Sequence, residues 1–253
     1  MANHPNVRLL RVTNNEVSSY SSGSGASIKF QSNDSDLHGV NRIHLKTSII
    51  PNTQYNINSK NNLLNISWAD MAGPFAPLPV GQYNITTFIA ALQAEFDLIT
   101  GEGAFEVVAD PLTYKITITR LNGINFTIAD KSVNPMYLVL GQDKAKTSIG
   151  GVLECDSIYN LSGLRHVYVE SFTLGKSLLT GSVKKYSTVA DIPISVPFGS
   201  FQNDIHTEEG LNNVYYKGWK NVSNFEMQLV DEFGDLIEFN GAPWILIFEI
   251  HGN

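Results

Sequence analysis

The sequence predicts an all-β fold, a sandwich or barrel of antiparallel strands with one short amphipathic helix. Short segments with apolar residues at every second position recur along most of the chain, and turn-forming pairs such as Asn-Gly and Asp-Pro separate many of them. Helical periodicity is convincing in one segment alone. With 253 residues, 43% of them hydrophobic, the chain can bury one sizeable core.

The first 25 residues are expected to form a flexible N-terminal arm. This expectation comes from Ser18–Gly25, whose sequence SSYSSGSG is typical of flexible segments. Residues 26–253 are expected to form a single domain, because the sequence contains no internal repeat and no convincing second boundary.

Period-two patterns and turn residues place the strands. Pro-rich residues 73–80 interrupt the series, because proline cannot continue a central strand, and the polar, Gly-rich residues 141–159 are expected to form a surface loop. Before the C-terminal segment, strands are expected at Ala26–Gln31, Asn41–Ile50, Asn61–Trp68, Phe105–Ala109, Tyr114–Thr119, Ile124–Ile128, Arg165–Leu174, Tyr186–Val196 and Val214–Tyr216.

The helix is expected over Thr86–Asp97, where Thr86 or Thr87 can cap its N-terminus. Four apolar residues form a stripe at helical spacing, and we expect this stripe to pack against the protein's own sheet. The stripe consists of Phe88, Ile89, Leu92 and Phe96.

The composition of the chain argues against several classes of function. The net charge is −7, only 16% of residues are charged, and the basic groups are small (Arg8 with Arg11, and Lys184-Lys185), so nucleic-acid recognition, which needs a basic stripe, is not expected. Cys155 is the sole cysteine, which precludes an intrachain disulfide, and its surroundings predict an inert thiol. No run approaches the roughly 18 apolar residues of a membrane helix, and the N-terminus lacks the apolar core of a signal peptide.

Metal binding and catalysis are not predicted, and no cofactor is expected. The nearest metal-binding pattern is His206 with Glu208 and Glu209, and a solvated polar loop is the preferred interpretation of it. Asp231, Glu232 and Asp235 offer too few oxygens for calcium, so turn formation explains them better.

The three tryptophans, Trp68, Trp219 and Trp244, could stack on sugars. Trp244 begins a strongly apolar strand and is expected in the core. Trp219, within Lys217–Lys220, is the candidate for an exposed aromatic that contacts a ligand, and the alternative is that it packs over the end of a sheet.

The C-terminal segment carries the most specific pattern. Val222–Val230 is expected to form a strand, Asp231-Glu232-Phe233-Gly234 a tight turn, Asp235–Phe239 a short return strand and Trp244–Ile250 the final strand. Gly234 supplies the positive φ that such a turn requires.

This ending resembles the C-terminus of penton-type capsid proteins of the single jelly-roll family, found in virophages and polinton-like viruses. The resemblance extends over residues 40–251, and the order and spacing of its short elements distinguish it. The elements are Ile50-Pro51, Tyr55-Asn56-Ile57, Pro79-Val80-Gly81-Gln82-Tyr83, Leu140-Gly141, Val167–Ser171, Ile192-Pro193-Ile194, Pro197-Phe198-Gly199 and Asp231-Glu232-Phe233-Gly234.

The resemblance implies a single jelly-roll sandwich of two four-stranded sheets, with the helix between the third and fourth strands. It implies a structural capsid protein without catalytic activity, the penton at the vertices of a small icosahedral double-stranded DNA virus. The expected partners are four more copies in a homopentamer and the major capsid protein of the same virion. The expected location is the capsid vertex of the virion, after synthesis and assembly in the host cell cytoplasm. The alternative is a carbohydrate-binding jelly roll, such as a receptor-binding spike or lectin head. A metal-dependent enzyme that binds its metal through His206 or another histidine is the third interpretation.

Overall fold

The chain divides into two compact units, and the second is inserted into the sequence of the first. Residues 1–54 and 164–253 form the first unit, and residues 55–163 form the second. The expected single domain over residues 26–253 therefore differs from the observed division. The computed structural model describes residues 6–14, 26–31, 39–69, 71–74, 77–101, 103–171, 174, 176–178, 186–207, 212–220 and 224–252.

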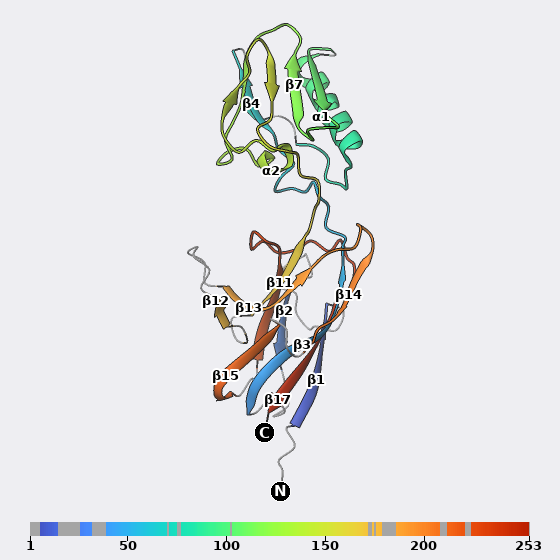
Figure 1. Cartoon of the computed structure of the whole chain (residues 1–253), viewed down its shortest axis with the longest axis vertical. Helices are drawn as coiled ribbons and strands as arrows, with labels where there is room; N and C mark the ends of the chain where they lie inside the picture. Colours follow the sequence, from blue (N-terminus) through green and yellow to red (C-terminus); the bar gives the residue numbers. More distant parts are fainter. Residues whose placement is uncertain are drawn as a thin grey trace. The chain divides into compact units, whose positions relative to one another are not determined.

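The first unit consists of two antiparallel sheets (Figure 1). The first sheet contains β1 (Asn6–Thr13), β17 (Ile245–Gly252), β3 (Val40–Pro51), β14 (Phe201–Ile205) and β15 (Asn213–Lys220). Its order is β1-β17-β3-β14, and β15 also pairs with β3. The second sheet contains, in order, β12 (Lys176–Leu178), β13 (Tyr186–Pro193), β11 (His166–Glu170), β16 (Asn224–Val230) and β2 (Ser27–Gln31).

The strand pairing of the first unit is nested. β1 pairs with β17, β2 with β16, β3 with β14 and β15, and β11 with β13. The pairs β3–β17 and β11–β16 join these hairpin-like pairs within each sheet. A long antiparallel ribbon folded over itself in this way gives the two Greek keys of a jelly roll. The protein is therefore an all-β protein built on a jelly-roll sandwich, which confirms the predicted fold class.

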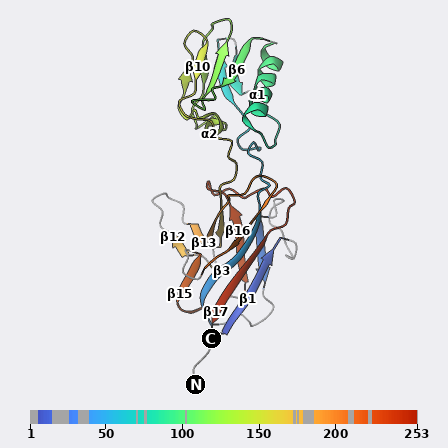
Figure 2. The same ribbon diagram turned by 45° about the vertical axis from the view of Figure 1, so that its right-hand side comes forward.

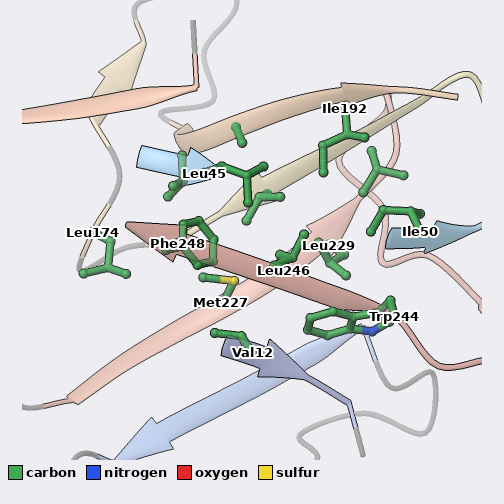
Figure 3. Close-up of a cluster of buried hydrophobic side chains, with 14 of the residues drawn as sticks. Val12, Leu45, Ile50, Leu174, Ile192, Met227, Leu229, Trp244, Leu246 and Phe248 are labelled. Atoms are coloured by element: carbon green, nitrogen blue, oxygen red, sulfur yellow. The ribbon is translucent and has the colours of Figure 1, made fainter. Parts of the chain in front are cut away.

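The core of the first unit lies between its two sheets (Figure 3). Alternate residues of β17 point inward, among them Leu246 and Phe248, and Trp244 just before the strand is fully buried. Figure 3 shows these side chains beside Leu229 from the second sheet. The prediction that Trp244 lies in the core is confirmed. Burial of each such side chain contributes about 1.5–3 kcal/mol.

Strand β1 corrects the prediction of an N-terminal arm. Asn6–Thr13 pairs along its whole length with β17, so this part of residues 1–25 belongs to the first sheet. Val12 joins the core and Leu10 packs against it, whereas Leu9 on the opposite face is exposed. Residues 1–5 and 15–25 lie outside the described residues.

Two further elements near the C-terminus differ from expectation. A solvated polar loop was expected around His206, but Phe201–Ile205, directly before it, forms β14, which pairs with β3. The expected return strand Asp235–Phe239 makes one isolated bridge, between Val230 and Leu236. The turn before it holds the chain close to β16, and a full strand does not form there.

The second unit contains a three-stranded and a four-stranded sheet with its own hydrophobic core. The first sheet of this unit has the order β10 (Val152–Glu154), β7 (Ile116–Arg120), β6 (Phe105–Ala109). The other has the order β5 (Met71–Pro74), β4 (Asn65–Trp68), β8 (Phe126–Ile128), β9 (Lys146–Thr147). Strands β9 and β10 lie in the segment 141–159 that was expected to be a loop, and the apolar run before it forms the short helix α2 (Tyr137–Leu140).

The predicted helix is confirmed as α1 (Ile85–Thr100), which packs beside β6 (Figure 2). Its cap differs from the prediction. Asn84 Oδ1 accepts the Thr87 N–H at 2.9 Å, and Thr87 Oγ1 accepts the Asn84 N–H at 3.0 Å, which forms a capping box. Phe88, Leu92 and Phe96 are buried, as the stripe predicts. Among the described residues, no helix is long and apolar enough to cross a membrane.

Candidate functional site

A line of polar side chains connects strand β3 to the segment between β14 and β15. His206 Nε2 lies 3.0 Å from Ser48 Oγ, and His206 Nδ1 lies 3.1 Å from Asn212 Nδ2. Serine, histidine and an amide or carboxylate in line are also the elements of nucleophilic catalysis. The direction of each hydrogen bond decides whether this line can act in that way.

The Asn212 amide fixes those directions. Its Oδ1 accepts the Asp191 N–H at 3.0 Å, and its Nδ2 donates to the Asp191 carbonyl oxygen at 3.3 Å. Because Nδ2 is a donor, His206 Nδ1 accepts, and the proton of a neutral imidazole then lies on Nε2, directed at Ser48. This tautomer cannot take a proton from Ser48, which is fully buried. The arrangement therefore ties strands together and does not activate a nucleophile.

Burial lowers the pKa of His206, and the nearby charge on His44 adds to this effect while Asp204 opposes it. His44 itself bridges the two ends of the β14–β15 connection. Its Nε2 lies 3.2 Å from the His206 carbonyl oxygen, and its Nδ1 lies 3.3 Å from the Asn212 carbonyl oxygen. The His206 N–H donates to the Lys46 carbonyl oxygen at 2.9 Å and the Leu45 N–H donates to the Asn212 carbonyl oxygen at 3.1 Å, so both ends of the connection are bound to β3.

The metal site considered for His206 is not assembled by the described residues. Glu208 and Glu209 lie outside them, and His206 is engaged with Ser48 and Asn212. Across the part of the chain that the structure describes, no group of three histidine, cysteine or acidic side chains could hold a metal ion.

The acidic turn after β16 is held by its own backbone. Asp231 Oδ1 accepts the N–H groups of Phe233 and Asp235, both at 2.9 Å, and Gly234 has a φ of 80°. Glu232 accepts from Arg165 Nε at 3.1 Å and from Arg165 Nη2 at 3.0 Å. These contacts fix the turn against the start of β11, and they account for the Asp-Glu-x-Gly pattern by local structure.

The candidate aromatic Trp219 belongs to β15, but its side chain lies outside the described residues. Trp68 is half-buried, with the Arg120 guanidinium carbon 5.0 Å from the centre of its ring.

Cys155 is buried, and burial raises the pKa of its thiol to about 12, so the thiol is unreactive near neutral pH.

The outer face of the first sheet carries a surface that the sequence did not reveal. Directly opposite residues of an antiparallel sheet point to the same face. Ile49 lies opposite Ile245, and both Ile247 and Ile205 lie opposite Thr47. Their chain neighbours Ile50 and Leu246 belong to the core, so these residues point away from it. We call the following set the isoleucine surface: Ile49, Phe201, Ile205, Ile245 and Ile247.

The exposure of this surface is unusual for its position. Ile205 is 81% exposed and Phe201 is 50% exposed, while the other three members are half-buried and lie outside the core cluster. Antiparallel sheets with one solvated face normally place polar residues there. The polar residues Thr47 and Asn203 lie among these side chains on the same face, and exposed apolar side chains gathered on one face mark sites where another molecule binds. Sequence reasoning missed this surface because β14 was not predicted.

Cationic side chains lie beside the isoleucine surface on the same sheet. Arg11 on β1 and Lys46 on β3 are exposed, and Lys46 forms an ion pair with Glu249 on β17. The hydrogen bond from Lys46 lowers the pKa of Glu249. Arg42 Nε donates to Asn213 Oδ1 at 3.0 Å, and the guanidinium carbon lies 5.5 Å from the centre of the Tyr215 ring.

The outer face of the second sheet has a different chemistry. On β11, His166, Tyr168 and Glu170 alternate with core residues, and the rings of His166 and Tyr168 stack with their centroids 5.9 Å apart. His166 Nδ1 lies 2.9 Å from Asp191 Oδ1, and Glu226 on β16 is exposed. Partial burial raises the pKa of Tyr168, and the negative charges of Asp191 and Glu232 add to the rise. This face is therefore polar, with the stacked rings of His166 and Tyr168 on it, and Lys29 of β2 lies opposite Glu226 in the register.

No family model matches the chain, and no curated protein matches it. Among solved structures, it is similar to the crystal structure of the selenomethionine-labelled mavirus penton protein. The match has 12% sequence identity and a TM-score of 0.46, and it covers 98% of this chain and 100% of that chain. A likeness at this level does not establish the function of this chain.

Proposed function

We propose that this protein is a structural component of a viral capsid and forms the pentameric vertices of a small icosahedral double-stranded DNA virus. Its partners in this proposal are further copies of itself and the major capsid protein, and its place is in the virion after assembly in the host cytoplasm. In this role the chain acts as a building block and catalyses no reaction.

The isoleucine surface is the observation that carries the proposal. Phe201 and Ile205 are exposed on this face, and an assembly subunit buries such side chains against a neighbour. The resemblance of the Asp231-Glu232-Phe233-Gly234 ending and the earlier motifs to penton proteins agrees with this interpretation. The fold alone would not suffice, because jelly rolls have many functions.

Two measurements test the proposal. Native mass spectrometry of the purified chain over a concentration series should reveal a discrete pentamer. Co-expression with the major capsid protein of the same genome should give particles that contain the chain at a small fixed ratio. Particles that close fully without the chain contradict the proposal. A discrete trimer that binds sugars saturably would instead support a receptor-binding spike or lectin head.

A further inference from the structure

An arginine side chain lies at the core of the second unit without an acidic partner among the described residues. Arg120 is the last residue of β7, and it points to the same face as the core residues Ile116 and Ile118. It is 9% exposed, and its guanidinium makes no ion pair or hydrogen bond with any residue that the structure describes. A guanidinium keeps its charge throughout the physiological pH range, and a buried charge without a counter-charge costs stability.

Two aromatic rings hold this guanidinium in place. Its central carbon lies 5.0 Å from the centre of the Trp68 ring and 5.7 Å from the centre of the Phe105 ring. Phe105 lies opposite Arg120 in the register of β6 and β7, and Trp68 comes from β4 in the other sheet of the unit. Contacts between a cation and the faces of aromatic rings are favourable. They fix the side chain, but they give its N–H donors no acceptor.

The nitrogen atoms of the guanidinium differ in their surroundings. Nη1 is buried and has no hydrogen-bond partner. Nε and Nη2 also lack an acceptor among the described residues, yet they do not belong to the buried atoms without a partner, so they retain contact with solvent. The Nε–Nη2 edge carries two parallel N–H groups, and these match two oxygens of a carboxylate or a phosphate.

Two arginines of the first unit show which groups such an edge binds. Arg165 donates from Nε and from Nη2 to Glu232 Oε1, at 3.1 Å and 3.0 Å. Arg42 donates from Nε to Asn213 Oδ1 at 3.0 Å. In both cases the chain itself supplies the oxygen, whereas no described residue supplies one to Arg120. An acceptor for Arg120 therefore has to come from another molecule.

We infer that Arg120 anchors an oxyanion-binding site in the second unit. The ligand carries a carboxylate or phosphate group whose oxygens accept hydrogen bonds from Nε and Nη2 of Arg120. Binding places a counter-charge beside the buried cation. Because Trp68 and Phe105 already hold the guanidinium, little side-chain entropy is lost on binding. The site belongs to a different unit from the isoleucine surface, and the inference goes beyond the proposed capsid role without resting on it.

The first test titrates the purified chain with sodium phosphate and, separately, with sodium acetate at constant ionic strength. NMR follows the Nε–H signal of Arg120, which is assigned by its disappearance in Arg120→Lys. We expect the signal to move saturably, with half-saturation at about 1 mM for the oxyanion that fits better, and the comparison of the two salts tells phosphate from carboxylate. The Nε–H signal of Arg165 is the internal control and should move far less, because Glu232 already accepts from it.

The stability of the second unit gives an independent readout. A ligand that binds only the folded state stabilises it, so at ten times its dissociation constant the better oxyanion should slow amide exchange of β6 and β7 about tenfold. Arg120→Met should lose this response and keep its fold, since an apolar group in place of an unpaired buried charge is often neutral or stabilising. Arg165→Met is the matched control, because it removes an exposed guanidinium of the first unit, and it should keep the response.

Three results would overturn the inference. They are an Arg120 signal that neither salt moves up to about 100 mM, an Arg165 signal that moves as far as the Arg120 signal, and a stabilisation by oxyanions that survives in Arg120→Met. If Arg120→Met does not fold, Arg120→Lys replaces it, because lysine keeps the charge without two parallel donors and should weaken binding at least about fivefold. None of these results bears on the capsid role, which fails separately if particles form fully without the chain.

Discussion

Replacement of Asn56 by alanine should destabilise the second unit selectively. The Asn56 side chain is buried and joins three segments of this unit. Its Nδ2 donates to the carbonyl oxygens of Tyr83 at 2.8 Å and Leu161 at 2.9 Å, and its Oδ1 accepts the Tyr83 N–H at 2.9 Å. Alanine leaves all three backbone groups without these partners.

The magnitude follows from the three bonds. At about 1 kcal/mol net for each, the loss is about 3 kcal/mol. Since about 1.4 kcal/mol corresponds to a factor of ten, the slowest-exchanging amides of the second unit should lose protection by about a hundredfold. Native-state hydrogen exchange measures this unit by unit, and amides of β17 in the first unit serve as the internal reference.

A second substitution of Asn56 and a control variant at Asn203 test the same reasoning. Asn56→Asp keeps the acceptor for the Tyr83 N–H but directs negative oxygen at two carbonyls, so it should be at least as destabilising as alanine. Asn203→Ala changes an exposed asparagine on β14 and should alter stability by less than about 0.5 kcal/mol. A loss below about 0.5 kcal/mol for Asn56→Ala would refute the reasoning, and an equal loss in both units would refute their independence.

Three other predictions follow from single groups. Gly141→Ala should destabilise the second unit far more than Gly199→Ala does the first: both glycines have positive φ, but a Cβ at Gly141 would lie 2.5 Å from the Ile158 carbonyl oxygen, whereas at Gly199 it meets nothing within 4 Å. Urea unfolding of each variant compares them, and equal losses would show that φ alone matters. Because burial lowers the pKa of folded His206, the native state binds fewer protons than the unfolded chain, so stability of the first unit should fall as pH decreases below the ordinary histidine value of about 6.5. His206→Gln should flatten this dependence, and an unchanged slope would contradict the assignment. Cys155, with a pKa raised to about 12, should resist a thiol reagent at about pH 8 until urea unfolds the second unit, and rapid labelling of the folded chain would contradict its burial.

Local patterns predicted most of the individual elements. The alternation in Phe105–Ala109 gave β6 with its observed bounds, and the stripe of Phe88, Leu92 and Phe96 gave α1. These segments bury one face against a core, so the period of their apolar residues reports their conformation directly. The Asn-Gly turn at residues 240–241 is equally local, since both residues have positive φ and the Ala242 N–H donates to the Phe239 carbonyl oxygen at 2.9 Å.

The sequence did not predict strands β1 and β14, because their apolar residues do not alternate with polar ones as in a strand with one buried face. In β1, Leu9 and Val7 face outward while Leu10 and Val12 face inward, so apolar residues occur on both sides and the alternation disappears. β14 has the reverse problem, because Gln202 is buried and Ile205 is exposed. Gln202 Oε1 accepts from the Ser195 N–H at 3.1 Å. This contact gives the buried amide a partner, and no sequence pattern predicts it.

The division into two units was hidden for a topological reason. β3 ends at Pro51 and β11 begins at His166, and they belong to different sheets of the jelly roll, so the connection between them crosses from one sheet to the other. The entropy cost of closing that connection grows only with the logarithm of its length, which lets a long segment replace a short loop at little cost. The inserted residues have a core of their own and the same period-two alternation as the jelly roll. The sequence pattern therefore does not change at the boundary between the two units. Only the pairing of β3 with β17, far along the chain, places Ile50 in the first unit, whereas Ile57 lies in the core of the second.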